Sequence, residues 1–315
     1  MAKFCISRRE LIKTGTLATA GLTLAGANSL FAASNALPLI TRTIPSSRKE
    51  LPVVGVGTNQ FGTEDPEVLE RIQTLLQELP GLGGQVIDTA HSYGNSEDVI
   101  GRLTQENGNR DKLFLATKTS TRGDVTMADI EAAFARLRTD HIDLIQVHNF
   151  NQTEKVIPLL MNLRSDARIG YVGCSTSRDS QYEDLKSAMR QHRLDFIQVD
   201  YSIANRSADE EILPMAQDRG VAVLINMPFG GRRNAASIFG QVSDVALPDW
   251  AAEIDVTSWA QFFLKYVVSH PAVTTAIPGT TKPHHMEDNM GAARGRLADT
   301  AMRGEMERFW DSLPG

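Results

Sequence analysis

Short apolar runs rich in valine and isoleucine alternate along the chain with longer stretches whose apolar residues recur at helical spacing. The runs that predict strands are residues 53–57, 85–88, 113–118, 142–147, 169–174, 196–200, 222–226 and 274–278. Between them, helices are predicted at residues 67–79, 127–137, 153–163 and 209–219. Strands that are apolar throughout and separated by helices indicate a parallel sheet covered by helices.

The number and spacing of these units decide between two α/β folds. The predicted strands begin 26 to 32 residues apart, except for a gap of 52 residues before the last one. Eight such units in about 250 residues are typical of a (β/α)8 TIM barrel. An open doubly wound sheet usually has a glycine-rich turn after its first strand, and Gly55-Val56-Gly57-Thr58-Asn59-Gln60 lacks the third glycine. We therefore predict a barrel, with a hairpin at residues 39–52 closing its bottom and an insertion at residues 230–254.

The first 36 residues have a different pattern from the rest. Ser7-Arg8-Arg9-Glu10-Leu11-Ile12-Lys13 precedes an uncharged run at residues 14–33 that is rich in alanine, leucine, glycine and threonine. A basic head, an apolar middle and small residues at the end describe an export signal, and the paired arginines look like a twin-arginine signal. Ser34-Asn35-Ala36 is the favoured cleavage motif, and Ala25-Gly26-Ala27 is the second candidate.

The alternatives for this segment are a membrane anchor and a packed helix. Gly21 and Gly26 interrupt the apolar run, which argues against a stable spanning helix. We therefore expect a twin-arginine-type signal peptide at residues 1–36 and the barrel domain at residues 37–315. The expected partner is the twin-arginine export machinery, and the expected location is the periplasm, with no stable membrane span after processing.

Composition and charge exclude several functional classes. Hydrophobic residues make up 42% and charged residues 22% of the 315, which is a globular balance. A net charge of −6 gives no sign of a nucleic-acid-binding face. Two cysteines, Cys5 and Cys174, are too few for a disulfide scaffold or a cysteine-rich metal site.

Polar side chains stand at three successive strand ends, where the chemistry of a barrel is found. The second strand ends at Asp88, with Tyr93 shortly after it; the third ends at Lys118 and the fourth runs into His148. Taken singly, the aspartate, the tyrosine and the histidine have structural explanations, as a turn cap, a packing residue and a satisfied core residue. A lysine inside a barrel is harder to explain, because burying an unpaired ammonium is costly. Together the four residues predict a catalytic site.

At this point the sequence resembles the aldo-keto reductase family from about residue 50 to residue 297. The matching motifs are Asp88-Thr89-Ala90-His91-Ser92-Tyr93-Gly94, Lys118, His148, Ile169-Gly170-Tyr171-Val172-Gly173-Cys174-Ser175, Gln198-Val199-Asp200-Tyr201-Ser202, and Ile277-Pro278-Gly279 leading to Asp288-Asn289. The resemblance implies a (β/α)8 barrel that binds NADPH across its mouth and reduces aldehydes and ketones to alcohols.

The chemistry that this resemblance implies assigns a role to each of the four residues. Tyr93 is the expected proton donor, because hydride transfer to a carbonyl builds negative charge on oxygen. The cation of Lys118 favours the phenolate and so lowers the pKa of a neighbouring tyrosine. Asp88 is expected to hold Lys118 charged and in place, and His148 to orient and polarise the carbonyl.

Most of the family's cofactor-binding residues have a match in this sequence, and a few positions differ. The residues expected to bind NADP are Gly57, Thr58, Ser175, Gln198, Pro228, Phe229, Gly230, Thr280, Lys282, Asp288 and Asn289. Thr176 stands where the family often has asparagine, and Asn226-Met227 stands where many relatives stack an aromatic ring on the nicotinamide. His285 replaces an arginine of many relatives and so removes a permanent bidentate donor. NADP is nevertheless preferred over NAD in this interpretation.

The substrate is expected to be a small carbonyl compound in contact with His91, Asn149 and Phe150. Phe61, Phe229 and Trp259 are further candidates for an aromatic rim, although Trp259 is also explained as a core residue of a helix at residues 258–268. The adjacent His284 and His285 do not face one site on a helix, so no metal is expected. Two alternatives stay open: a non-catalytic NADP-binding regulatory subunit on the same barrel, and an unrelated barrel lyase or isomerase.

Overall fold

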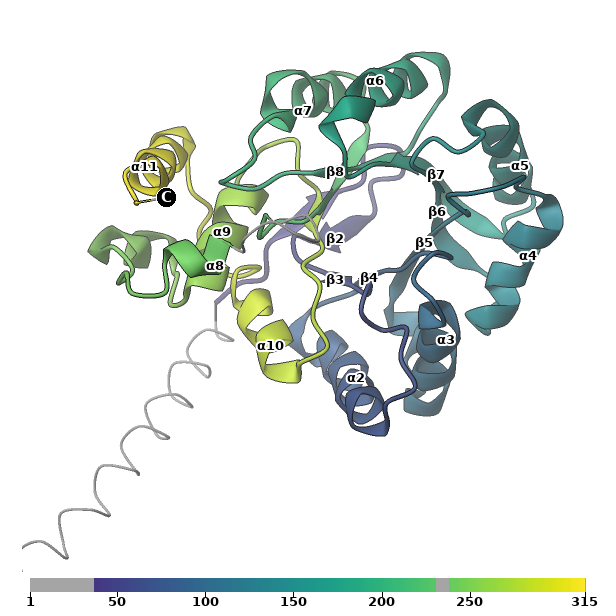
Figure 1. Cartoon of the computed structure of the whole chain (residues 1–315), viewed down its shortest axis with the longest axis horizontal. Helices are drawn as coiled ribbons and strands as arrows, with labels where there is room; N and C mark the ends of the chain where they lie inside the picture. Colours follow the sequence, from purple (N-terminus) through teal and green to yellow (C-terminus); the bar gives the residue numbers. More distant parts are fainter. Residues whose placement is uncertain (1–36, 231–237, 315) are drawn as a thin grey trace, which may run out of the picture. The chain divides into compact units, whose positions relative to one another are not determined.

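Eight parallel strands close into a barrel in the computed structural model, which describes residues 37–230 and 238–314 (Figure 1). The strands are β3 (Val56–Gly57), β4 (Val86–Asp88), β5 (Phe114–Lys118), β6 (Ile142–His148), β7 (Ile169–Ser175), β8 (Phe196–Asp200), β9 (Ala222–Asn226) and β10 (Thr275–Ala276). Each strand pairs with the next in sequence order. Between the first and last strands, Ala276 N donates to Val53 O at 2.8 Å and Gly57 N donates to Pro278 O at 3.0 Å. The predicted (β/α)8 barrel is confirmed.

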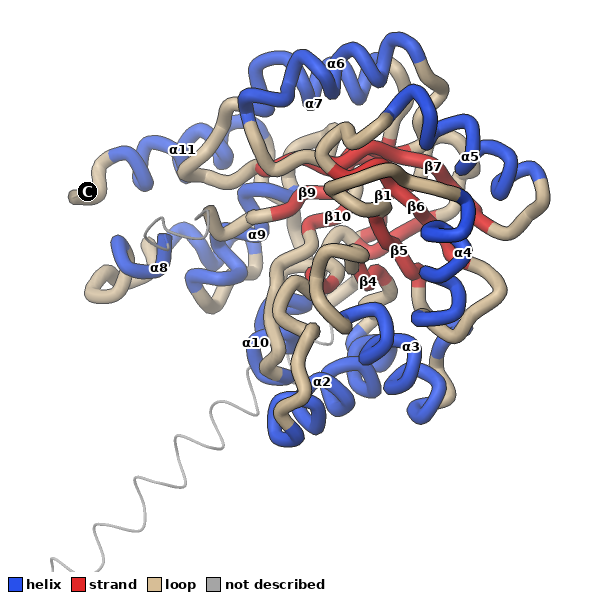
Figure 2. The backbone as a smooth tube through the Cα atoms, turned by 45° about the vertical axis from the view of Figure 1, so that its right-hand side comes forward, coloured by secondary structure: helices blue, strands red, loops and turns tan. Residues whose placement is uncertain are grey.

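Helices surround the strands, as both backbone views show (Figures 1 and 2). Those that follow barrel strands are α2 (Pro66–Glu78), α3 (Ser96–Asn107), α4 (Met127–Arg136), α5 (Thr153–Ser165), α6 (Tyr182–Gln191), α7 (Ala208–Asp218), α9 (Trp259–Val268) and α10 (Pro283–Gly291), and α11 (Thr300–Asp311) ends the chain. The four helices predicted from periodicity are confirmed to within two residues at each end. Local signals fix their starts: Asp65 caps α2 just before Pro66, and Thr126 and Asp129 form a capping box at α4.

A hairpin of β1 (Thr41–Thr43) and β2 (Glu50–Pro52) precedes the barrel. Ile44 and Leu51 of this hairpin are fully buried and belong to the same cluster as the apolar residues inside the barrel. The hairpin therefore closes one end of the barrel interior, as predicted from residues 39–52.

Two segments of interest lie partly or wholly outside the described residues. The export signal expected at residues 1–36 is one of them, and residues 231–237 of the expected insertion are the other. The described remainder of the insertion holds the short helix α8 (Ile238–Gln241) and a turn of 3-10 helix at Asp249–Ile254. Within the described ranges, no helix has the length and apolar character needed to cross a membrane.

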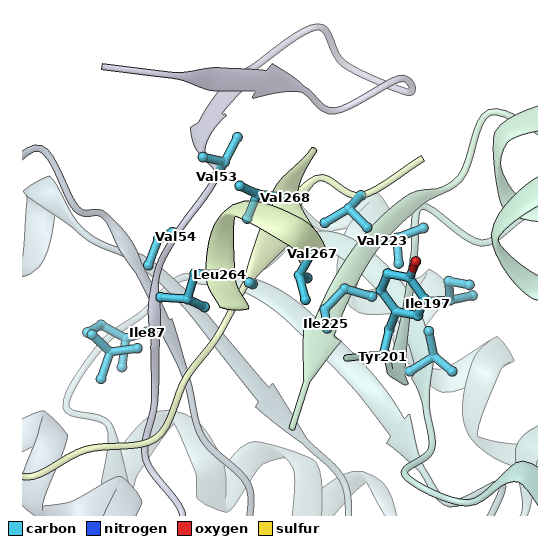
Figure 3. Close-up of a cluster of buried hydrophobic side chains, with 14 of the residues drawn as sticks. Val53, Val54, Ile87, Ile197, Tyr201, Val223, Ile225, Leu264, Val267 and Val268 are labelled. Atoms are coloured by element: carbon cyan, nitrogen blue, oxygen red, sulfur yellow. The ribbon is translucent and has the colours of Figure 1, made fainter. Parts of the chain in front are cut away.

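The strands divide their apolar side chains between two clusters because successive residues point to opposite faces. Inside the barrel lie Val86, Phe114, Ala116, Leu144, Tyr171, Phe196, Ala222, Leu224 and Ile277, together with the two hairpin residues. The alternate residues pack outward against the helices. Figure 3 shows part of this outer layer, where Leu264, Val267 and Val268 of α9 meet Val54 on one side and Val223 and Ile225 on the other.

Candidate active site

The interior of the barrel changes from apolar to polar toward the carboxyl ends of the strands. The strand period of two places one set of residues above the apolar interior cluster, on the same face. These residues are Asp88, Lys118, Gln146, His148, Ser175, Gln198 and Asn226. Six neighbouring strands thus bring their polar side chains to one end of the barrel, which is where barrel enzymes carry their chemistry.

Asp88 and Lys118 form a buried ion pair at the centre of this group. Lys118 Nζ donates to Asp88 Oδ2 at 2.5 Å and to the backbone oxygen of Thr89 at 2.8 Å. The exposed fractions of the two residues are 1% and 2%. A buried charge pair persists only where both partners are well bonded, because each ion has lost its hydration.

Burial acts in opposite senses on the two partners of this pair. Alone it would lower the pKa of Lys118, but the Asp88 carboxylate and the Tyr93 side chain offset this, so the pKa of Lys118 is raised and its ammonium stays charged at neutral pH. Burial raises the pKa of Asp88, and the lysine and two glutamine amides oppose that rise. The positive charge of Lys118 therefore does not change with pH around neutrality.

Tyr93 lies on the loop after β4 and faces the lysine. Lys118 Nζ is 5.3 Å from the centroid of the Tyr93 ring, and the tyrosine is partly exposed. The loop is tied to the barrel, because His91 N donates to Lys118 O at 3.2 Å. Gly62 allows the preceding loop to pack closely, since a Cβ there would lie 2.3 Å from Tyr93 O. Tyr93 therefore stands at the border between the buried ion pair and solvent.

His148 completes the predicted group of four. Its ring is perpendicular to that of Tyr93, with 6.3 Å between the ring centroids, and Ser92 Oγ lies 3.5 Å from its Nδ1. Burial lowers the pKa of His148 to about 3, and the cations of Lys118 and Arg178 act in the same direction. The imidazole is therefore neutral at physiological pH and offers one N–H donor.

A pH dependence of stability follows from His148. The unfolded chain binds a proton at this residue below about pH 6.5, whereas the folded protein does so only near pH 3. Folding stability is therefore lost as the pH falls through this window. Urea unfolding measures this loss. Between pH 7 and pH 4.5, we expect the free energy of unfolding of His148→Gln to fall by about 2 kcal/mol less than that of the wild type. His141→Gln, which removes an exposed histidine, is the control; equal losses in His148→Gln and the wild type would contradict this assignment.

Two of the predicted cofactor residues lie beside the four candidate catalytic residues. In the strand register, Ser175 pairs with both His148 and Gln198. Gln198 is buried and its Nε2 donates to Asp88 Oδ2 at 3.4 Å. Gln198, the expected carboxamide-binding glutamine, is thus in direct contact with Asp88, the partner of Lys118.

The residues predicted to contact the cofactor after the first and seventh barrel strands make contacts within the protein itself. Thr58 is fully buried and its hydroxyl donates to Asp88 O at 2.9 Å, so this side chain joins β3 to β4. Gly57 lies at the closure of the barrel, where a Cβ would meet Ile277 O at 2.6 Å. The turn containing Pro228 and Phe229 closes with a hydrogen bond from Gly230 N to Met227 O at 2.9 Å. Its cofactor contacts remain predictions.

The last predicted cofactor group lies at the N-terminus of α10. Thr280 is buried, and its Oγ1 accepts a hydrogen bond from Lys282 N at 3.1 Å, while the Lys282 side chain is exposed. Asn289 is buried within α10. The Asp288 carboxylate accepts hydrogen bonds from Ser258 and Gln261, each at 2.8 Å. In this structure Asp288 therefore joins α10 to the start of α9.

The three predicted substrate residues have different surroundings in the structure. His91 is exposed beside the site and its Nδ1 lies 3.1 Å from a nitrogen of the Arg136 guanidinium. Asn149 directly follows His148, with φ at 51°. Phe150 also lines a groove beside α5 and α6, together with residues such as Lys155 and Gln191. The contacts of His91, Asn149 and Phe150 with substrate remain predictions.

The predicted aromatic rim is wrong at Phe61. Phe61 is fully buried in the outer apolar cluster, so it presents no surface at the mouth. Trp259 is partly buried, packs against Phe263 and Phe309 and donates to Val245 O at 2.9 Å, which favours its interpretation as part of the apolar cluster. Phe229 is partly exposed and meets Phe239 edge-on at 5.0 Å between ring centroids.

Sequence reasoning missed Gln146 and the side-chain role of Asn226. Gln146 bonds to both Asp88 and Gln198, and Asn226 Nδ2 donates to Thr176 O at 3.0 Å across the end of β8. Strand alternation was the available signal, because Gln146 stands two residues before His148 on one strand face. Among the described residues, no group of three or more histidine, cysteine, aspartate or glutamate side chains is arranged to hold a metal ion.

The chain is similar in sequence to known proteins. The sequence model described as the aldo/keto reductase family matches residues 53–307. The aldo-keto reductase YhdN of Bacillus subtilis (strain 168) is 30% identical over 186 residues, which span 54% of each chain. The methylglyoxal reductase YeaE of Escherichia coli (strain K12) is 26% identical over 262 residues, covering 80% of this chain and 89% of the relative.

A solved structure shows the same fold. An aldo-keto reductase from Klebsiella pneumoniae in complex with NADPH superposes with a TM-score of 0.69 at 22% identity, covering 87% of this chain and 96% of the other. At this identity the likeness concerns the fold alone, whereas the family match covers most of the sequence. The chain, with its barrel and its four converging polar residues, belongs to the aldo/keto reductase family.

Proposed function

We propose that this protein reduces aldehydes and ketones to alcohols with NADPH as the reductant. The observation that carries the proposal is the convergence of Tyr93 with the buried Asp88–Lys118 pair and His148 at the mouth of a barrel of this family. The YeaE relative is named a methylglyoxal reductase, and the Klebsiella pneumoniae neighbour was solved with NADPH. Both names support a small carbonyl substrate and this cofactor.

Each of the four side chains has a separate role in protonating the carbonyl oxygen. When bound, the nicotinamide supplies a hydride to the carbonyl carbon. Tyr93 gives its hydroxyl proton to the carbonyl oxygen as negative charge develops there, and regains a proton from solvent. Lys118, held charged by Asp88, stabilises the resulting phenolate. Neutral His148 donates its N–H to the same carbonyl oxygen and so fixes the direction of the carbonyl.

The residues at the carboxyl ends of the later strands suit a nicotinamide nucleotide. Asn226 Oδ1 is buried with no hydrogen-bond partner among the described residues, although its Nδ2 is held by Thr176 O. An orphaned acceptor on a side chain held by Thr176, the residue after Ser175, suits a group that carries amide donors. Thr280, Lys282 and the N-terminus of α10 suit a phosphate.

Lys282 is expected to carry the preference for NADPH over NADH. Burial and the nearby His284 and Lys282 lower the pKa of His285, so that histidine supplies little positive charge at neutral pH. We expect Lys282→Ala to weaken NADPH binding about five- to tenfold and to leave NADH binding unchanged within about twofold, since the contact is exposed. Fluorescence titration of both cofactors measures this, with Lys112→Ala, at an exposed lysine before β5, as the control.

The proposed function is tested by combining this titration with a turnover assay on the wild-type protein. Purified wild type should oxidise NADPH when a simple aldehyde is added, and should bind NADPH more tightly than NADH. Tight NADPH binding without turnover on a panel of aldehydes and ketones would contradict the reductase and would favour a regulatory NADP-binding subunit. Equal affinities of the wild type for NADPH and NADH would contradict the assignment of Lys282.

We propose that residues 1–36 direct the protein through the twin-arginine export machinery to the periplasm. The support is the Ser7-Arg8-Arg9-Glu10-Leu11-Ile12-Lys13 motif and the uncharged run that follows it. A fusion of residues 1–40 to a folded reporter should be exported, and the double substitution Arg8→Lys/Arg9→Lys should abolish this. Fractionation of cells measures the outcome, and full export of the double variant would refute the proposal.

A further inference from the structure

Gln146 joins the Asp88–Lys118 pair to the expected cofactor residue Gln198. Its side chain is fully buried inside the barrel and lies beside both Asp88 and Gln198. Gln146 Nε2 donates to Gln198 Oε1 at 2.9 Å and to Asp88 Oδ1 at 3.4 Å. Gln198 Nε2 donates in turn to Asp88 Oδ2 at 3.4 Å. The three side chains form a closed hydrogen-bonded triangle beneath Tyr93 and His148.

The orientation of the Gln146 amide is determined by the charge of Asp88. Gln146 Oε1 is buried and has no hydrogen-bond partner among the described residues. Such an unsatisfied acceptor is costly, and turning the amide over would place Oε1 against a carboxylate oxygen, acceptor against acceptor. Both N–H groups of Gln146 are therefore directed at the triangle, and the orphaned oxygen is the consequence.

We propose that Gln146 is a positioning residue that couples the cofactor position at Gln198 to the Asp88–Lys118 pair. The inference rests on the proposed function, in which Gln198 binds the carboxamide of NADPH. By holding Gln198 Oε1, Gln146 fixes the orientation of the amide that meets the cofactor. By holding Asp88 Oδ1, it leaves Oδ2 facing Lys118 Nζ, and so places the cation beside Tyr93.

If Gln146 had a purely structural role, its substitution would lower stability by enough to account for the whole loss of activity. Gln146 lies just above Leu144 of the apolar interior cluster, so methionine, an unbranched side chain of similar size, suits this position. Gln146→Met removes the orphaned oxygen together with the two donated hydrogen bonds. Removing the orphaned oxygen offsets only part of the cost of leaving Gln198 Oε1 and Asp88 Oδ1 without this donor, so we expect the thermal midpoint to fall by a few degrees while the geometry of Asp88 and Gln198 is released.

The test is a double-mutant cycle on cofactor binding. NADPH dissociation constants are measured by fluorescence for wild type, Gln146→Met, Gln198→Met and the double variant. We expect each single substitution to weaken binding about fivefold, and the double variant to be no weaker than Gln198→Met alone, because Gln146 acts on the cofactor through Gln198. Gln191→Met, at an exposed glutamine of α6, is the matched control and should match wild type.

Kinetics of the same variants report the effect on Asp88. Gln146→Met should lower kcat about tenfold, leave the aldehyde KM within about twofold, and shift the pH profile of kcat, because Lys118 is no longer held in register with Tyr93. Its thermal midpoint should stay within about 5 °C of wild type. Should the methionine variant not fold, Gln146→Asn, which keeps the amide but shortens its reach, should give the same non-additive pattern.

Three results would overturn the inference. They are additive losses of NADPH affinity in the double variant, an unchanged pH profile in Gln146→Met, and a loss of stability that accounts for the whole loss of activity. Failure of the proposed function is distinguishable, because wild type would then bind NADPH without oxidising it in the presence of aldehydes. The binding cycle measures the link between Gln146 and Gln198 in either case.

Discussion

Tyr93→Phe should abolish aldehyde-dependent oxidation of NADPH while leaving NADPH binding unchanged. The substitution removes one hydroxyl and keeps the ring that faces Lys118 and His148. Loss of a positioned proton donor costs about 10²–10⁴-fold in rate, and we expect kcat to fall in that range. The NADPH dissociation constant should stay within about twofold, and the unfolding midpoint should not move, because Tyr93 is partly exposed.

A matched control exists at the other end of the barrel. The hydroxyl of Tyr171 lies 2.7 Å from Ser47 Oγ, near the hairpin that closes the interior. Tyr171→Phe makes the same chemical change far from the strands' carboxyl ends and should retain wild-type turnover. Equal turnover by wild type and Tyr93→Phe would show that the proton comes from another group.

Lys118→Met should impair both activity and stability, for separate reasons. Activity falls because the cation that stabilises the Tyr93 phenolate is gone, and we expect a loss of at least about 10²-fold in kcat. Stability falls because Asp88, which is 1% exposed, loses its counter-ion. Removing one partner of a buried ion pair costs about 3–5 kcal/mol.

A second substitution separates these two effects. Adding Asp88→Asn to Lys118→Met removes the unpaired charge and keeps one oxygen, which can accept from the amide of either Gln146 or Gln198. The double variant should recover part of the lost unfolding free energy in urea denaturation, and should remain inactive. If Lys118→Met were as stable as wild type, the carboxylate would not be charged in the folded protein, and the account of the ion pair would be wrong.

Much of the fold and the convergence of the four candidate residues could be predicted because both depend on local patterns. The apolar runs marked all eight barrel strands, and β8 and β9 have the predicted bounds. Asp88, Lys118 and His148 stand at strand ends, so the barrel topology alone brings them to one face. The predicted strand at residues 53–57 is shorter in the sheet as β3, which pairs with β4 only at Val56 and Gly57 and meets the last strand through isolated bridges at Val54 and Gly57.

The features that were missed depend on contacts across the barrel or on the packing of loops. The triangle of Gln146, Gln198 and Asp88 joins three strands, and no single segment carries a signal for it. Phe61 was expected at the mouth because its loop follows a strand end. A loop position does not determine which way a ring points, and burial in the apolar cluster was favoured.

The most direct test of the central claim follows a labelled hydride in a single turnover. NADPH that carries deuterium at the transferred position is mixed with excess wild-type protein and an aldehyde, and the alcohol is examined by mass spectrometry and NMR. The account predicts one deuterium on the carbinol carbon with wild type and almost none, over the same time, with Tyr93→Phe. An unlabelled alcohol, or equal labelling by both proteins, would contradict it.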